Sequence, residues 1–265
     1  MKLSLWLLPD APTSDILRHH IQRLADTASS LSSSSSLPTH SGPFVPHITV
    51  LGGIHVENEQ ECERLQNRLK QFLGVKDGDG PMDGWTGGII ECELENPMTP
   101  TVMLVEDNGG TADSDESFSS ENGRKRNLPL TWNQCVTLSV RPSEKFLALH
   151  DACVYATEPF RSCASGPCIE TEVTSSDRPL VSLFPPPLQR PHISLYYSED
   201  ELPFDIIGDK ETGMQSLPLD SPTVPSKFEA HTVELWCTDP SSVEGVKEWK
   251  SLWSYDLRLD KKELH

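Results

Sequence analysis

The chain has 265 residues, of which 36% are hydrophobic and 23% are charged, and its formal net charge is −18. This length allows one large domain or two small ones, and the composition is that of an ordinary soluble protein. The acidic balance argues against a protein that holds a long polyanion, because binding of extended RNA or DNA depends on clustered Lys and Arg. A small nucleotide in a locally positive pocket is compatible with this charge.

The first residues resemble a signal peptide only briefly. Lys2 precedes a short apolar run that ends at Pro9, without a small-residue cleavage site. The alternation of this run predicts a first β-strand over residues 2–8, and no stretch approaches the ~20 apolar residues of a membrane span. We therefore expect a cytoplasmic protein by default, while an association with internal membranes such as the Golgi stays open.

Hydrophobic periodicity then predicts alternating helices and strands. Thr13–Ala28 is predicted to be an amphipathic helix, capped by Thr13 or Ser14, and residues 29–36 form a serine-rich surface connection. Further helices are predicted over 57–73, 143–155 and 241–252, and further strands over 45–51, 89–94, 101–105, 135–140, 191–197, 231–237 and 254–259.

Two segments are predicted to lie outside the core. Residues 107–127 contain almost nothing apolar and are predicted to be a disordered insertion, and residues 157–189 are predicted to be a long loop. The chain has seven cysteines, an odd number, which we expect to be reduced. Cys163 and Cys168 could form a disulfide in this loop, and the sequence does not decide whether they do. Their spacing is not that of a zinc site, so we expect no metal and no cofactor.

One short motif occurs twice in the chain. Residues 44–50 read Phe-Val-Pro-His-Ile-Thr-Val and residues 189–197 read Gln-Arg-Pro-His-Ile-Ser-Leu-Tyr-Tyr, so that the two histidines lie 145 positions apart (192 − 47). In both halves a strand ends at a proline, a helix and a loop follow, and the motif strand comes next. This weak internal repeat predicts two lobes whose motifs meet across a cleft.

Each motif pairs an imidazole with a hydroxyl. Side chains alternate along a strand, so His47 and Thr49 share one face while Ile48 points into a core, and the same holds for His192, Ser194 and Ile193. Two imidazoles and two hydroxyls suit a phosphodiester: one neutral histidine takes a proton from water, and the other, protonated, gives a proton to the leaving oxygen. The hydroxyls stabilise the charge on the non-bridging oxygens. A single His-Ile-Thr is usually structural, and it is the matched pair that favours catalysis.

On these motifs the chain resembles the two-histidine phosphoesterases, and more closely the cyclic phosphodiesterases of fungi and plants. The matching pieces are residues 4–10, 44–49 and 192–197. The resemblance implies an α+β fold in which residues 1–265 form a single bilobal catalytic domain. Two antiparallel-sheet lobes would be related by pseudo-twofold symmetry around a central cleft, with helices outside.

The resemblance also implies an activity and a set of site residues. The activity is metal-independent hydrolysis of nucleoside 2',3'-cyclic phosphates to 2'-phosphates, and of ADP-ribose 1'',2''-cyclic phosphate, a by-product of tRNA splicing, to ADP-ribose 1''-phosphate. By analogy alone, His192 is the base and His47 the acid. Thr49 and Ser194 would hold the phosphate, and Trp6 and Tyr197 would face the nucleotide. The partner is thus a small nucleotide bound by a monomer, and the base preference is not determined.

Two alternatives stay open. A related enzyme that processes 2',3'-cyclic phosphate ends or 2',5' linkages of RNA would need a basic track beside the cleft, which the acidic balance disfavours. A nucleotide-binding module without catalysis would have no reason to keep both imidazoles. The other histidines are expected to be structural, and His231, near a strand start, is the one whose position relative to the cleft should be checked.

Overall fold

The computed structural model describes residues 1–31, 41–74, 85–97, 99–104, 134–160, 191–198 and 222–258. Within them lie three α-helices, two short 3₁₀-helices and eight strands. The helices are α1 (Ala11–Leu31), α2 (Glu59–Leu73), α3 (Glu144–Thr157), η1 (Glu158–Phe160) and η3 (Glu244–Glu248). The strands are β1 (Lys2–Pro9), β2 (Ile48–His55), β3 (Ile90–Leu94), β4 (Thr101–Leu104), β5 (Gln134–Arg141), β6 (His192–Ser198), β7 (Lys227–Cys237) and β8 (Lys250–Asp256).

Polar side chains fix the helix starts. Asp10 accepts a hydrogen bond from the backbone N–H of Thr13 at 2.8 Å, so α1 begins after Asp10 and is longer at both ends than the predicted Thr13–Ala28. Asn58 accepts from the backbone N–H of Glu61, and Ser143 from that of Phe146. These caps set the points where the chain leaves β1, β2 and β5 for the three helices.

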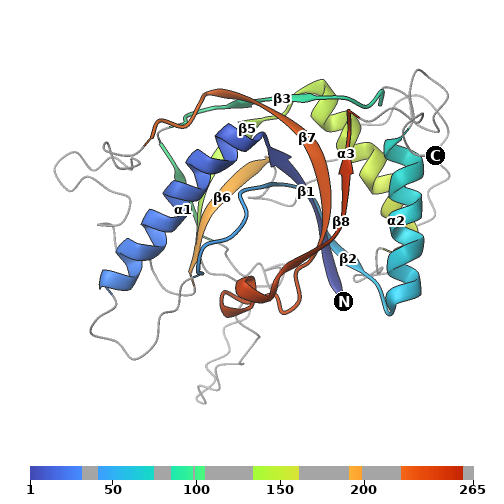
Figure 1. Ribbon diagram of the computed structural model, residues 1–265, viewed down its shortest axis with the longest axis horizontal. Helices are drawn as coiled ribbons and strands as arrows, with labels where there is room; N and C mark the ends of the chain where they lie inside the picture. The colour runs from blue at the N-terminus through green and yellow to red at the C-terminus, as the bar shows by residue number, and fades with distance from the viewer. Residues whose placement is uncertain are drawn as a thin grey trace, which may run out of the picture.

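All strand pairs are antiparallel and connect into one sheet. The order is β1-β2-β6-β5-β3-β7-β8, β4 pairs with β5, and β1 also pairs with β7. The six strands β1, β2, β6, β5, β3 and β7 therefore close into a ring, which the view of Figure 1 displays. The predicted α+β class with antiparallel strands is confirmed.

Two short junctions divide the strands of the sheet into one group of β1, β2, β3, β7 and β8 and another of β4, β5 and β6. The junction of β2 and β6 is the single pair Ile48 and Ile193. The junction of β3 and β5 consists of two pairs, Glu93 with Arg141 and Leu94 with Val140. By contrast, β1 pairs with β7 through seven residues. The lobes thus share one continuous sheet instead of two separate sheets.

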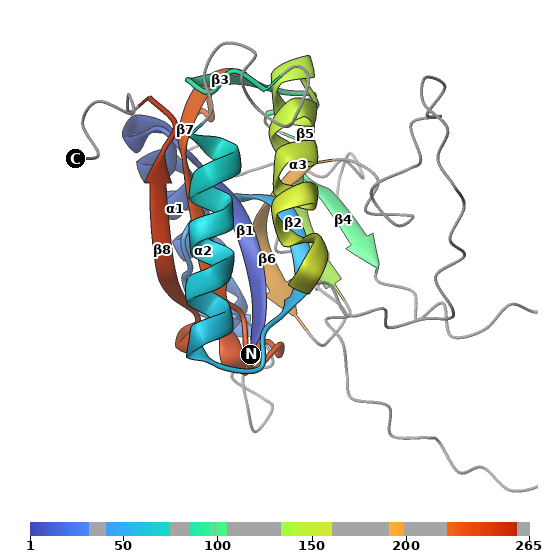
Figure 2. The ribbon, with the colours of Figure 1, turned by 90° about the vertical axis from the view of Figure 1, so that its right-hand side faces the viewer.

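Helices α1 and α3 each pack against a strand from the other half of the chain. The series β1-α1-β2 is repeated in order by β5-α3-β6, as the internal repeat predicts. Helix α1 packs against β6 of the second half, α3 packs against β2 of the first half, and α2 lies beside α3. Figure 2 shows α2 and α3 side by side over the sheet. Each motif strand is therefore covered by a helix from the other half.

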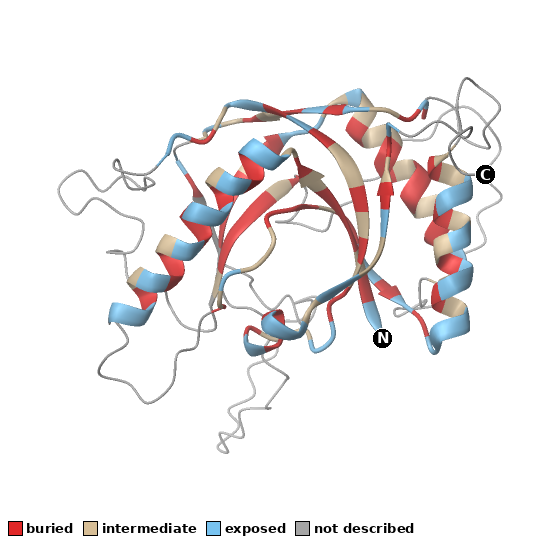
Figure 3. Cartoon of the chain, viewed as in Figure 1, coloured by how far each residue is buried: buried red, intermediate tan, exposed pale blue. Residues whose placement is uncertain are grey.

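The core lies between these helices and one face of the sheet. Alternate residues of β1 (Leu3, Leu5 and Leu7) are fully buried, and Ile48, Ile193 and Leu138 continue the same face across β2, β6 and β5. Figure 3 shows this pattern as alternating buried and less buried segments along the strands. The opposite face of the same strands carries the polar residues of both motifs.

One predicted element is wrong and several boundaries move. The predicted helix over 241–252 is instead the short 3₁₀-helix η3, and β8 begins at Lys250, before the predicted 254–259 strand. The reason is that the backbone of Lys250–Asp256 pairs with β7, so sheet formation overrides the local preference. Residues 107–127, most of 157–189, Cys163 and Cys168 lie outside the described residues, as does part of 29–36.

No helix among the described residues is long and apolar enough to cross a membrane.

Candidate active site

The junction between β2 and β6 brings the two motifs together. Ile48 pairs with Ile193 in antiparallel register, so the neighbouring positions place His47 opposite Ser194 and Thr49 opposite His192. Directly opposite residues lie on the same face of a sheet, and here that face is the one turned away from the two buried isoleucines. Each imidazole thus lies across from the hydroxyl of the other motif, as the sequence predicts for a shared site.

The neighbouring strands extend this polar row. On β5, Thr137 pairs with Ser194 and Ser139 pairs with His192, and on β1, Trp6 pairs with Thr49. Thr137 is 1% exposed and Ser139 is half-buried. Sequence reasoning missed both β5 hydroxyls, because only the register between β5 and β6 shows that they flank the motif.

His47 is enclosed and has a defined tautomer. Its side chain is 2% exposed, and Nδ1 lies 2.7 Å from the backbone oxygen of Val45. A carbonyl oxygen can only accept, so Nδ1 carries the hydrogen and donates it. In the neutral ring Nε2 is consequently the acceptor nitrogen, and it is the atom available for proton transfer.

Burial controls the protonation of His47. Removal of the ring from water lowers the pKa of His47 to about 3, against the opposing effect of the Val45 hydrogen bond. Repulsion from the His192 ring, across the β2–β6 junction, lowers the pKa of His47 further. His47 is therefore neutral at neutral pH in the free protein. His192, on β6, is half-buried and so more open to solvent.

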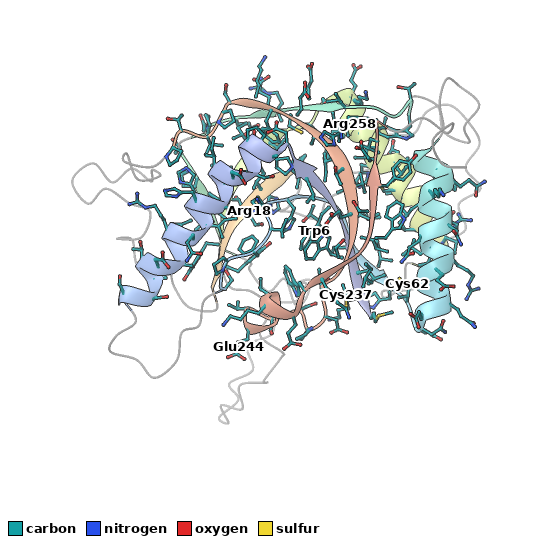
Figure 4. All side chains as sticks on the ribbon, viewed as in Figure 1. Trp6, Arg18, Cys62, Cys237, Glu244 and Arg258 are labelled. Atoms are coloured by element: carbon teal, nitrogen blue, oxygen red, sulfur yellow. The ribbon has the colours of Figure 1, made fainter. Side chains whose placement is uncertain are left out.

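Trp6 lies against His47. The two rings are stacked, with centroids 3.6 Å apart and planes 7° apart, and the other face of Trp6 stacks on Trp236 at 4.4 Å. Trp6 is 2% exposed, and in Figure 4 it lies near the centre of the view, between α1 and β8. Both faces of the indole are covered, so Trp6 contacts His47 and Trp236 and does not offer an open face to a nucleotide.

Tyr197 belongs to a rim of half-buried aromatic side chains. Its ring centroid lies 5.0 Å from that of Phe44 and 6.2 Å from that of Trp249, which in turn lies 5.7 Å from that of Trp6. Phe44 precedes the first motif, and Trp249 lies in the connection between η3 and β8. Phe44, Trp249 and Trp236 were not predicted, because their meeting depends on how remote parts of the chain pack.

Three of the other histidines that the structure describes have surroundings outside this row. His231, on β7, contacts the hydroxyl of Thr232 at 3.1 Å and lies 3.7 Å from Asp256 on β8. Buried His20, on α1, lies 2.8 Å from the backbone oxygen of Pro222, and exposed His55 is at the far end of β2. These positions agree with the structural roles expected of them.

Among the described residues no group of three or more His, Cys, Asp or Glu side chains could hold a metal ion. An open pocket of about 410 Å³ lies where β3, β5 and β7 meet, and neither motif lines it. Its charged side chains are largely engaged with one another, since Arg141 lies 2.8 Å and Lys227 3.8 Å from Glu93. The paired motifs are therefore the better candidate for chemistry.

Comparison with known proteins agrees with the motif-based prediction for the first third of the chain. The family model described as cyclic phosphodiesterase-like protein matches residues 1–87, which include the first motif but not the second. The resemblance drawn from the motifs is thus confirmed over this part. No curated protein matches the chain.

Solved structures show weaker similarity over nearly the whole length. The protein TT0787 of Thermus thermophilus is 13% identical with a TM-score of 0.46, and the match covers 97% of this chain and 98% of that one. Escherichia coli LigT complexed with 3'-AMP is 10% identical with a TM-score of 0.40, at 97% and 98% coverage. Kluyveromyces marxianus Usb1 is 11% identical with a TM-score of 0.39, at 95% and 96% coverage. At these values the similarity supports neither a substrate nor a mechanism.

Proposed function

We propose that this protein is a metal-independent cyclic phosphodiesterase. It hydrolyses nucleoside 2',3'-cyclic phosphates to nucleoside 2'-phosphates, and ADP-ribose 1'',2''-cyclic phosphate to ADP-ribose 1''-phosphate. The observation that carries the proposal is the pairing of Ile48 with Ile193, because that register sets two imidazoles and two hydroxyls on one face of the sheet. The match of residues 1–87 to the cyclic phosphodiesterase-like family supports the same reaction class.

The proposed reaction is a single displacement at phosphorus. His192 takes a proton from water, the water oxygen forms a bond to phosphorus, and the bond from phosphorus to O3' breaks. His47 gives its Nε2 proton to O3', so the product keeps its phosphate on O2'. Thr49 and Ser194 donate hydrogen bonds to the non-bridging oxygens, where negative charge accumulates in the transition state. The assignment of acid and base follows the family analogy.

The low pKa of His47 places a condition on this mechanism. A ring with a pKa of about 3 carries no proton on Nε2 at neutral pH, so His47 must gain that proton when substrate binds if it is to act as the acid. The cyclic phosphate is an anion, and an anion beside the imidazole favours its protonated form. Substrate and proton therefore enter together, and the free protein keeps the ring neutral in its buried position.

The aromatic rim supports a nucleoside as the rest of the substrate. Tyr197 and Trp249 are half-buried neighbours, and Phe44 lies beside Tyr197. Stacking of a base on an aromatic side chain contributes about 1–3 kcal/mol. Tyr197 keeps the nucleotide-binding role proposed for it, with Trp249 as a neighbour. Trp6 acts on the reaction through its stacking contact with His47 and not through the nucleoside.

Product analysis with purified full-length protein tests the function. The four nucleoside 2',3'-cyclic phosphates and ADP-ribose 1'',2''-cyclic phosphate would each be incubated in EDTA, with chromatographic separation of 2'- from 3'-phosphates. We expect undiminished turnover in EDTA, 2'-phosphate products from the nucleotides, and a bell-shaped pH dependence of kcat/KM.

Three outcomes would contradict this proposal. Inhibition by EDTA that zinc or manganese reverses would refute the metal-independent mechanism. Turnover only of oligonucleotides with cyclic phosphate ends would indicate an RNA-end enzyme. Binding of cyclic nucleotides without turnover would indicate a binding module.

A further inference from the structure

The indole of Trp6 is the middle layer of a three-ring stack formed by His47, Trp6 and Trp236. The His47 and Trp6 planes differ by 7°, and the Trp6 and Trp236 planes differ by 21°. A contact of 3.6 Å between ring centroids is at van der Waals distance, so the imidazole lies flat on the indole. Trp6 thus covers one complete face of His47.

The back of the stack is anchored to β7. The indole N–H of Trp236 donates to Oε2 of Glu234 at 2.7 Å, and Glu234 pairs with Trp6 across the strands β1 and β7. A charge-assisted hydrogen bond of this length restricts the rotation of Trp236. Trp6 is therefore held between a fixed ring and His47, and the strand pairing determines its height in the sheet.

The remaining contacts of His47 complete its orientation. Nδ1 donates to the backbone oxygen of Val45, and the edge of Phe44 approaches with its ring plane at 62° to that of His47. With one face on Trp6 and Nδ1 on Val45, rotation of the imidazole would break a stacked contact or a buried hydrogen bond. The direction of Nε2 is consequently defined by Trp6 and Val45 together.

We propose that Trp6 is a positioning residue that holds the His47 ring in line for proton transfer and stabilises its charged form by a cation–π contact. The proposal rests on the proposed function in one respect, since the charged form matters only if His47 donates a proton. An indole face is the best aromatic partner for a cation, and the contact is stronger where water is excluded. Among the titratable groups around the stack, His192 on β6 interacts electrostatically with His47, and Glu234 on β7 accepts the hydrogen bond of Trp236.

NMR titration of the His47 ring nitrogens tests this assignment without relying on turnover. Wild type, Trp6→Phe and Trp6→Leu would be titrated with and without saturating inorganic phosphate. Trp253→Phe is the matched control, because Trp253 stacks on Tyr255 at 5.7 Å in β8 and not on His47. In the phosphate-bound protein we expect the His47 pKa to fall by about one unit in Trp6→Leu, by less in Trp6→Phe, and not at all in the control.

Kinetics on a nucleoside 2',3'-cyclic phosphate provide the second readout. A positioning residue acts in the proton transfer, so kcat should fall about tenfold or more in Trp6→Leu while KM changes less than threefold. Trp6→Phe should restore part of kcat because a ring face remains. A nucleotide-stacking residue would behave in the opposite way and raise KM at nearly constant kcat.

Folding of each variant is checked by its melting curve. If Trp6→Leu does not fold, the effect on the His47 pKa and on kcat is measured in Trp6→Phe and Trp236→Leu instead. Trp6→Phe keeps an aromatic ring at position 6, and Trp236→Leu removes only the ring behind Trp6. An unchanged His47 pKa in folded variants, or a loss confined to KM, would overturn the proposal. Absence of turnover in wild type would refute the proposed function instead, and the titration would still report on the stack.

Discussion

At the scale of single residues, the sequence indicated the two histidines of the candidate site but not their surroundings. His47, Thr49, His192 and Ser194 follow from a repeated motif and from the alternation of strand side chains. The contact between Trp6 and His47 does not follow from either, because it depends on the β1–β2 and β1–β7 registers and on the rotamers of both rings. Local patterns encode which face a residue occupies, and packing decides which ring covers it.

The buried state of His47 predicts a loss of stability in acid. The folded protein keeps this ring neutral down to about pH 3, whereas an unfolded histidine binds a proton below about pH 6.5. The unfolded chain therefore binds more protons between these values, and stability falls as the pH is lowered through this window. Between pH 7 and pH 4, we expect wild type to lose on the order of 3 kcal/mol more unfolding free energy than His47→Gln, measured in urea.

His55→Gln is the matched control for this experiment. His55 is an exposed histidine at the other end of β2, so its replacement should leave the pH dependence of wild type unchanged. Parallel pH curves for wild type and His47→Gln would show that the ring at position 47 takes up its proton as readily in the folded protein as in the unfolded chain.

At the scale of elements, the connection between β7 and β8 shows where prediction failed. The helices α2 and α3 were predicted from apolar residues at helical spacing. Those of α3 (Phe146, Leu149 and Cys153) are buried, and in α2 Cys62, Leu65 and Leu69 are buried while Phe72 is half-buried against the core. The helix predicted over residues 241–252 did not form, and the pairing of the backbone from Lys250 onward with the distant strand β7 was not visible in the sequence. Elements with their own periodicity were thus predictable, and an element made by pairing was not.

Gly245 tests how tightly this connection is packed. A Cβ added at this position would lie 2.3 Å from the backbone oxygen of Pro240, a distance that requires the backbone to move. We expect Gly245→Ala to lower the unfolding free energy by about 2 kcal/mol or more. It should also shift the fluorescence of Trp249, whose indole donates to the same oxygen at 3.1 Å.

Gly52→Ala is the comparison, because its Cβ would meet nothing closer than Ser4 Oγ at 3.7 Å. This variant should unfold within about 1 kcal/mol of wild type. If both alanine variants melt together with wild type, the close packing of η3 against Pro240 is not present in solution.

At the scale of the whole molecule, closure of the sheet is what creates the site. The internal repeat predicted the same element order in both halves, and β1-α1-β2 and β5-α3-β6 show that order. The ring of strands was not predictable, because the β3–β5 and β2–β6 junctions join strands far apart in sequence through one or two residue pairs. The proposed function depends on the smaller junction, because it requires the imidazoles of both halves to act on one bound phosphate.

A double-mutant cycle in kcat/KM tests this claim most directly. His47→Ala, His192→Ala and the double variant would be assayed on a nucleoside 2',3'-cyclic phosphate, with His55→Ala as control and melting curves to confirm folding. Two groups that act in one step are not additive, so each single variant should lose about 10³-fold and the double variant little more. Losses that multiply in the double variant, or a single variant that keeps its activity, would contradict a shared site.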